Sequence, residues 1–222
     1  MLKSIGIEQV SVAGDTRFDR VYEIAQQAKR LPEIERFAAD APVFIAGSTW
    51  PPDEELLVGL IERYPDVKFI VAPHEIDPAR IEKFCERISR PALRYTQLTP
   101  QSDLAAAGVL FVDTIGILSS VYRYGRWGYI GGGFGAGIHN TLEAATFGLP
   151  LAFGPRYGKF REARDLVTLR GAASIASAEE LERWFAGLHD DPDATGRSGT
   201  ICKEYVLQHK GATARIMDEI CR

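Results

Sequence analysis

The feature that most constrains the fold of this chain is an alternation of short apolar runs with amphipathic segments of helix length. Runs such as KFIVA at 68–72 and VLFVD at 109–113 are continuously apolar instead of alternating with polar residues. Strands of a parallel sheet read this way, because helices cover both faces of the sheet. We therefore predict an α/β fold, a doubly wound parallel sheet of the Rossmann-like type.

The predicted strands share β-branched or aromatic apolar residues; they are Val43–Ala46, Val67–Ala72, Leu93–Thr96, Val109–Asp113, Trp127–Gly131, Pro150–Phe153 and Ala172–Ile175. The predicted helices between them are Pro52–Tyr64, Pro78–Arg90, Ile115–Tyr124, Asn140–Phe147, Phe160–Arg170 and Ala178–Leu188. Before the first strand, Thr16–Arg36 is mostly helical and should pack beside the sheet.

Three segments make up the predicted organisation of the chain. Residues 1–40 form an N-terminal helical segment between domains, and 41–190 form a nucleotide-sugar-binding domain. Residues 191–222 add helices that pack on this domain, at about Gly199–His209 and Ala212–Cys221. Polar residues and a proline at Asp190–Ser198 predict a linker before these helices.

Composition excludes several classes of protein. The 222 residues carry a net charge of −4, so no basic footprint supports binding to nucleic acid. The three cysteines are far apart in the sequence, which argues against a disulfide framework and indicates a reducing compartment. No apolar run reaches the ~18 residues of a membrane span, and the first residues lack the pattern of a signal peptide. We expect a soluble chain in the cytosol.

Small and polar residues follow five of the predicted strands. They are Gly47-Ser48-Thr49, Pro73-His74-Glu75, Asp113-Thr114-Ile115-Gly116, Gly131–Gly137 with His139-Asn140, and Gly154-Pro155-Arg156. Parallel sheets bind ligands outside the carboxyl ends of their strands, where backbone N–H groups at helix starts bind anions. These loops predict a ligand that lies across this edge.

The glycine run formally matches a dinucleotide-binding fingerprint at Gly131, Gly133 and Ala136. It follows a late strand instead of the first, and no acidic residue ends a suitable second strand, which argues against a dehydrogenase. The glycines could allow close approach of the backbone to a phosphate or sugar, or could serve turns with positive φ angles. The two explanations are compatible.

Asn140-Thr141-Leu142-Glu143 has two interpretations. Asn140 and Glu143 resemble an N-cap and the third position of a capping box. Alternatively, Glu143 accepts hydrogen bonds from a ribose diol while the helix start holds a phosphate. His139 likewise could donate to a phosphate or be satisfied within its loop.

No metal site is indicated, since no cluster of His, Cys and carboxylates has ligand spacing. Asp191-Pro192-Asp193 matches the D-x-D pattern that binds a metal–diphosphate in some glycosyltransferases, but we interpret it as a solvated loop. Neither a nucleophile elbow nor a P-loop occurs. We expect neither a metal nor a cofactor.

The loops together resemble a known family. The residues that carry the resemblance are Gly14-Asp15-Thr16-Arg17-Phe18-Asp19, Gly47-Ser48-Thr49, Ala72-Pro73-His74, Asp113-Thr114-Ile115-Gly116, Gly131–Gly133, His139–Ala145, Gly148-Leu149-Pro150 and Phe153-Gly154-Pro155. Their order resembles the C-terminal half of the 3-deoxy-D-manno-octulosonate (Kdo) transferases of lipopolysaccharide synthesis, up to about Arg170. H-N-x-L-E-[AP]-A followed by G-x-P and F-G-P is the most specific part.

The resemblance implies a GT-B glycosyltransferase, with two Rossmann-like domains that face a cleft. Such an enzyme transfers Kdo from CMP-Kdo to a lipid A precursor at the cytoplasmic face of the bacterial inner membrane. The chain would be the donor-binding half. Acceptor recognition, membrane association and the catalytic base would belong to a further domain of ~150–200 residues, so no catalytic residue is expected in this chain, which alone should not catalyse transfer.

The resemblance also implies where CMP-Kdo binds. The expected binding residues are Ser48, Thr49, Pro73, His74, Ile115, Gly116, Ile117, His139, Asn140, Glu143 and Lys159. Asn140 and the helix start would bind the single phosphate, and Glu143 would bind the ribose. The backbone at 115–117 would contact the cytosine edge.

Three positions depart from the family pattern. His74 stands where the family usually has Arg, which gives a titratable donor in place of a permanent charge. Ile117 replaces a Glu, so only backbone contact is expected there. Lys159 replaces an Asn and could reach the Kdo carboxylate, or be solvated. An isomerase like the nucleotide-sugar 2-epimerases and a non-catalytic nucleotide-binding module are the alternative functions.

Overall fold

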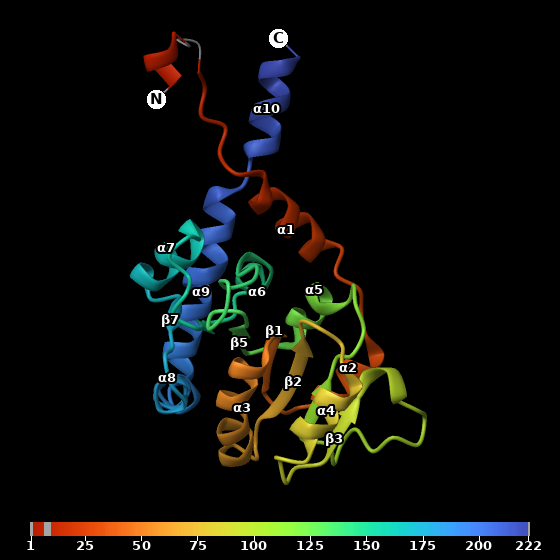
Figure 1. Ribbon diagram of the computed structural model, residues 1–222. Coiled ribbons are helices and arrows are strands. Elements are labelled where there is room, and N and C mark those ends of the chain that lie inside the picture. Colours follow the sequence, from red (N-terminus) through yellow and green to blue (C-terminus); the bar gives the residue numbers. More distant parts are fainter. Residues whose placement is uncertain (1, 7–9, 222) are drawn as a thin grey trace.

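A computed structural model describes residues 2–6 and 10–221, and within them it forms a seven-stranded parallel sheet (Figure 1). The strands are β1 Val43–Thr49, β2 Lys68–Pro73, β3 Ala92–Arg94, β4 Val109–Phe111, β5 Trp127–Ile130, β6 Leu151–Phe153 and β7 Ala172–Ser174. Their spatial order is β3-β4-β2-β1-β5-β6-β7, and every neighbouring pair is parallel. The predicted doubly wound α/β fold is confirmed.

The helices of the described residues are α1 Thr16–Gln26, α2 Pro32–Ala38, α3 Pro51–Arg63, α4 Pro78–Cys85, α5 Leu118–Val121, α6 Leu142–Thr146, α7 Arg161–Leu169, α8 Ala178–His189, α9 Pro192–His209 and α10 Ala212–Ile220. Short 3-10 helices occur at η1 Leu2–Ile5, η2 Tyr95–Gln97 and η3 Tyr122–Tyr124. The chain ends carried by η1 and α10 lie at the same end of the molecule (Figure 1).

The two faces of the sheet carry separate apolar cores. Along β1, Val43 and Ile45 belong to one buried cluster, whereas Phe44 and Ala46 belong to the other. Helices α3, α4 and α8 contribute to the cluster with Phe44, and α1, α2, α6, α7 and α9 contribute to the cluster with Ile45. Since β1, β2, β4, β5 and β6 are buried on both faces, their continuous apolar runs in the sequence are explained.

The linker predicted at Asp190–Ser198 is wrong, because α9 begins at Pro192. The Asp191 side chain accepts hydrogen bonds from the backbone N–H groups of Asp193 and Ala194, both at 3.0 Å. Asp at the N-cap followed by Pro at the first helical position is a helix start, so the D-x-D pattern is a cap.

The N-terminal residues that precede the sheet form α1 and α2. Helix α1 packs on α6, α9 and α10, and α2 packs beside η3. Residues 1 and 7–9 of the predicted 1–40 segment lie outside the described residues. The division of the chain at 40 and 190 stays a prediction.

The strand order places a topological switch point at the middle of the sheet. The chain builds β1 and then β2, β3 and β4 on one side, and crosses to the other side of β1 for β5. The direction of winding reverses between β1 and β5, and ligands of parallel sheets bind outside the carboxyl ends at such a switch point. The loops after β1 and β5 therefore border the expected site.

Candidate functional site

The carboxyl end of β1 has an irregular backbone. The register with β2 shifts between Gly47 and Thr49, and Ser48 between them has a φ of 55°. A positive φ costs a non-glycine residue about 1–2 kcal/mol, and such strain often marks functional sites. The Ser48 side chain is half-buried, whereas the fully buried Thr49 hydroxyl donates to Glu54 at 3.0 Å. Of this predicted pair, only Ser48 has a partly exposed side chain.

The glycine run packs against the protein's own backbone. A Cβ on Gly131 would lie 2.1 Å from the Ser48 carbonyl oxygen, and one on Gly133 would lie 2.5 Å from Gly154 Cα. Gly132 has a φ of +92°, which glycine adopts readily. Both explanations offered for the glycines therefore hold, but the close approach is to the loops after β1 and β6.

Asp53 holds these loops together, and sequence reasoning missed it. This fully buried carboxylate accepts hydrogen bonds from the Tyr129 hydroxyl at 2.7 Å and from the backbone N–H groups of Gly132 and Trp50, both at 2.9 Å. Asp53 lies in the first turn of α3, where the helix dipole favours a negative charge. A Pro-Pro-Asp start directly after a strand was the available signal.

Three rings stack where the loops after β1, β2 and β5 meet. His74 lies 4.1 Å from His139 and 4.8 Å from Trp50 between ring centroids, with interplanar angles of 24° and 29°. The Trp50 indole Nε1–H donates to His139 Nε2 at 3.0 Å. The His74 backbone N–H donates to the Thr49 carbonyl oxygen at 2.9 Å, which fixes the loop after β2 against β1.

Burial lowers the pKa of His139, and the neighbouring His74 lowers it further, while Asp53 acts in the opposite direction. His74 is exposed and precedes a bend before α4. The stack thus joins a half-buried imidazole, whose pKa is lowered, to a solvent-exposed one.

Asn140 and Glu143 contact each other at the start of α6. The Asn140 side-chain oxygen accepts from the Leu142 backbone N–H, and its Nδ2 donates to Glu143 Oε1, both at 3.0 Å. Glu143 Oε1 therefore receives a side-chain N–H, not the backbone N–H of a capping box. Thr141, the N-cap residue by backbone position, has a buried hydroxyl that lacks a hydrogen-bond partner.

Glu143 is a half-buried carboxylate that forms no ion pair within the part of the chain that the structure describes. Burial raises its pKa, and the single hydrogen bond from Asn140 lowers it by less. Its charge in turn adds to burial in raising the pKa of the Tyr122 hydroxyl, which fills the space beside Gly47. Glu143 therefore lies near the carboxyl end of β1, with acceptor capacity left over for a ligand.

The loop after β4 presents backbone at the same edge. Ile115 is 85% exposed, and Gly116 has a φ of +86° with open space where a Cβ would stand. Asp113 anchors the loop, since it accepts from Arg94 Nε at 2.9 Å and from the Thr96 hydroxyl at 2.6 Å. Although burial raises the pKa of Asp113, the hydrogen bonds from Thr96 and Arg94 lower it overall.

Lys159 lies in the turn before α7 with an exposed side chain, and it makes no ion pair with any described residue. The same loop is bonded to the glycine run, because Arg156 Nη1 donates to the Gly135 carbonyl oxygen at 2.7 Å. The Phe160 ring would lie 3.2 Å from a Cβ on Gly137. The loop after β6 is therefore held beside the loop after β5.

The predicted residues therefore fall into one contiguous group and two outlying ones. Loops joined by hydrogen bonds or ring contacts carry Ser48, Thr49, Pro73, His74, His139, Asn140 and Glu143. Ile115–Ile117 follow the end of β4, and Lys159 lies in the loop after β6, which is hydrogen-bonded to the glycine run through Arg156. Sequence reasoning missed Trp50, which completes the contiguous group.

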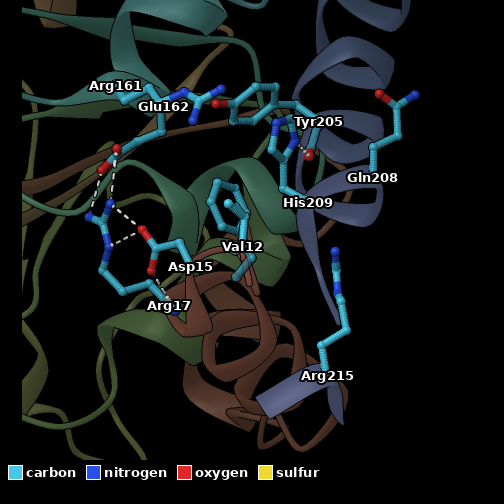
Figure 2. A pocket seen from close by; sticks show the side chains of 11 residues that line it. Val12, Asp15, Arg17, Arg161, Glu162, Tyr205, Gln208, His209 and Arg215 are labelled. Carbon is cyan, nitrogen blue, oxygen red and sulfur yellow. Dashed lines mark hydrogen bonds and ion pairs between the residues drawn. The ribbon is translucent and has the colours of Figure 1, made fainter. Parts of the chain in front are cut away.

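A separate pocket of about 350 Å³ opens between the N-terminal segment, α7 and α9 (Figure 2). Figure 2 shows the Arg17 guanidinium between Asp15 and Glu162, and Arg17 Nη1 donates to Glu162 Oε1 at 2.8 Å. None of the eleven residues expected to bind the donor lines this pocket. No group of three or more potential metal ligands occurs in the described residues, and no helix among them is long and apolar enough to span a membrane.

Comparison with known proteins finds several 3-deoxy-D-manno-octulosonic acid transferases among the relatives of this chain. The chain is 24% identical over 221 residues to the 3-deoxy-D-manno-octulosonic acid transferase of Haemophilus influenzae, covering 95% of this chain and 51% of that protein. The enzyme of the same name from Rickettsia bellii is 27% identical over 222 residues, covering 97% and 52%. The chain spans about half the length of these curated relatives. No protein-family model matches.

Solved structures agree on the fold. The C-terminal CMP-Kdo binding domain of WaaA from Acinetobacter baumannii superposes with a TM-score of 0.68 at 22% identity, covering 86% of this chain and 99% of that one. The UDP-GlcNAc 2-epimerase from Neisseria meningitidis bound to UDP-GlcNAc gives a TM-score of 0.60 at 16% identity, covering 93% and 57%. The resemblance to Kdo transferases and the architecture of a GT-B half are confirmed.

Proposed function

We propose that this chain is the donor-binding half of a Kdo transferase and that it binds CMP-Kdo at the carboxyl edge of its sheet. The observation that carries the proposal is Glu143, a desolvated carboxylate without a cationic partner that lies beside Asn140 at the switch point. A protein stabilises such a group poorly by itself, whereas hydroxyl donors of a ligand would satisfy it. The names of the relatives and of the superposed CMP-Kdo binding domain support the same ligand.

Each part of the donor has a matching group in this proposal. Asn140, His139 and the Ser48 side chain border the position of the phosphate, with the backbone at the start of α6. Glu143 accepts the ribose hydroxyls. The exposed backbone at Ile115–Ile117 meets the cytosine edge.

Three further residues complete the set. Pro73 and His74 close the site from the end of β2. Lys159 has an ammonium without a partner in the described chain, and it pairs with the carboxylate of Kdo. Thr49 contributes through Glu54, because its hydroxyl is already used.

The chemistry of the leaving group fits this set of residues. CMP carries one phosphate, whose charge hydrogen-bond donors such as Asn140, His139 and Ser48 can stabilise. Within this chain the residues act by binding and orienting the donor. Acceptor recognition, the lipid A precursor, the catalytic base and association with the cytoplasmic face of the inner membrane belong to the proposed whole enzyme.

Isothermal calorimetry with CMP or CTP tests the proposal. We expect weak binding to the isolated chain that is unchanged when Mg²⁺ is replaced by a chelator. A strict requirement for a divalent ion would contradict the assignment of the phosphate to Asn140 and His139.

A thermal-shift comparison of CMP with UDP separates the transferase from an epimerase-like function. A ligand stabilises the folded state by RT ln(1 + [L]/Kd), so the nucleotide that fits the site gives the larger rise in melting temperature. We expect CMP to give it. A larger rise with UDP would favour the epimerase.

A further inference from the structure

The Trp50 indole determines where the proton of His139 resides. An indole N–H is a donor only, so the 3.0 Å hydrogen bond from Trp50 Nε1 needs a lone pair on His139 Nε2. A neutral imidazole has one N–H and one acceptor nitrogen. His139 therefore carries its proton on Nδ1.

The two edges of the His139 ring face different surroundings. A Cβ built on Gly132 would lie 3.0 Å from His139 Cδ2 and 3.2 Å from Nε2, so this edge packs on the glycine run and on Trp50. Nδ1 stands across the ring from the Nε2–Cδ2 bond. It makes no hydrogen bond with any of the described residues, so its N–H points away from the glycine run and is free to donate.

The Trp50 indole, burial and the neighbouring His74 oppose protonation of the His139 ring. A proton on Nε2 would meet the indole N–H head on. Burial and the stacked His74 lower the pKa of His139, against the opposite pull of the buried Asp53. The hydrogen bond from the indole and the lowered pKa both favour the neutral form of the His139 ring.

We propose that Trp50 is a positioning residue: it holds His139 as a neutral Nδ1–H donor toward the phosphate of the nucleotide and supports His74 above it by stacking. The inference rests on the proposed function, since the phosphate is that of the CMP moiety. It assigns different tasks to the two histidines. His139 donates to the phosphate through Nδ1, whereas His74 covers the His139 and Trp50 rings by stacking.

The experiment compares the wild type with Trp50→Phe, which keeps an aromatic ring for stacking but removes the N–H. Two-dimensional ¹⁵N–¹H spectra of the imidazoles report the tautomer directly, with His139→Gln to assign the signals. We expect His139 to carry Nδ1–H in the wild type and to lose this preference in Trp50→Phe. The matched control is Trp184→Phe, because the Trp184 ring packs on the buried cluster that contains Phe44.

Calorimetry with CMP and with cytidine, which lacks the phosphate, supplies the functional readout. The hydrogen bond from the Trp50 indole to His139 joins two neutral groups. The free energy of such a bond corresponds to about a three- to tenfold change in affinity. We expect Trp50→Phe to lower the affinity for CMP by that factor and to leave the affinity for cytidine unchanged. In the double variant with His139→Gln, the Trp50 change should cost nothing more, because the ring that it positions is gone.

The outcomes separate the two claims. If CMP does not bind the wild type, the proposed function falls and the phosphate role of His139 falls with it. If CMP binds, then a wild-type His139 with its proton on Nε2, or equal losses for CMP and cytidine in Trp50→Phe, overturns the positioning role alone. The wild-type tautomer decides the matter even if Trp50→Phe fails to fold.

Discussion

At the scale of single residues, Glu143 is where ligand binding and stability oppose each other. Because burial raises its pKa, the ionised carboxylate costs the folded state stability above that pKa, and the cost disappears below the ordinary value near 4.3. Glu143→Gln should therefore be at least as stable as the wild type at neutral pH and lose this advantage in acid. Thermal unfolding across pH without ligand checks this expectation.

Glu143→Gln should also lower the affinity for CMP on the order of tenfold or more, since a hydrogen bond to a charged group contributes ~1.5–3 kcal/mol. 2′-Deoxy-CMP should bind the wild type poorly. Its affinity should also fall less than that of CMP on substitution, because the 2′-hydroxyl that Glu143 would contact is already absent. Glu204→Gln, an exposed change on α9, is the matched control. Equal losses for both nucleotides would contradict a ribose contact.

The sequence pattern predicted the position of some residues of the candidate site and missed others. His139, Asn140 and Glu143 follow a recognisable strand, so their place at the edge could be deduced from the α/β pattern alone. Asp53 and Trp50 could not, because their importance arises from partners 79 and 89 residues away in the chain, Gly132 and His139. Contacts between positions so far apart in the sequence depend on tertiary packing, and a local sequence pattern does not predict them.

At the scale of elements, the glycine loop after β5 and the bulge of β1 form one unit. Gly131→Ala would place a methyl group 2.1 Å from the Ser48 carbonyl oxygen, and a backbone atom cannot yield as a flexible side chain can. We expect a loss of several kcal/mol in the free energy of unfolding, measured by urea denaturation. Gly135→Ala is the control: its nearest neighbour would be 3.6 Å away, so its unfolding curve should barely change.

Elements were predicted where local chemistry is decisive. All seven strands were predicted, and for most of them the reason is that burial on both faces produces a continuous apolar run in the sequence. The start of α9 was mistaken for a linker, although the cap chemistry at Asp191 and Pro192 was present in the sequence. The insertion of β4 between β2 and β3 had no local signal, since strand order depends on which distant edges pair.

At the scale of the whole molecule, His189 connects the end of α8 to the turn before β2 through a hydrogen bond to Asp66. Its Nδ1 lies 2.9 Å from Asp190 Oδ1 and its Nε2 lies 2.8 Å from Asp66 Oδ2. The hydrogen bond to Asp190 is the largest cause that raises the pKa of His189, and Asp66 adds to it against the effect of burial. A raised pKa contributes stability that is complete below about 6.5 and is lost as the pH rises through the folded value.

We therefore expect the wild type to exceed His189→Gln in stability by more at a pH of about 5.5 than at about 8.5. Denaturant unfolding at both values measures the difference. Asp190→Asn should flatten the pH dependence, because it removes the largest cause of the shift. A difference that grows with pH would contradict this account.

The central place of β1 also bears on the order in which the chain can assemble during synthesis. β1 emerges as residues 43–49 and can pair with β2 soon afterwards, but its other neighbour is β5 at residues 127–130. Until then the apolar strand has one unpaired edge, the kind of edge that recruits other chains. A ribosome-bound nascent chain that stops before residue 127 should therefore need a chaperone to stay unaggregated, and one that extends past β5 should need it less.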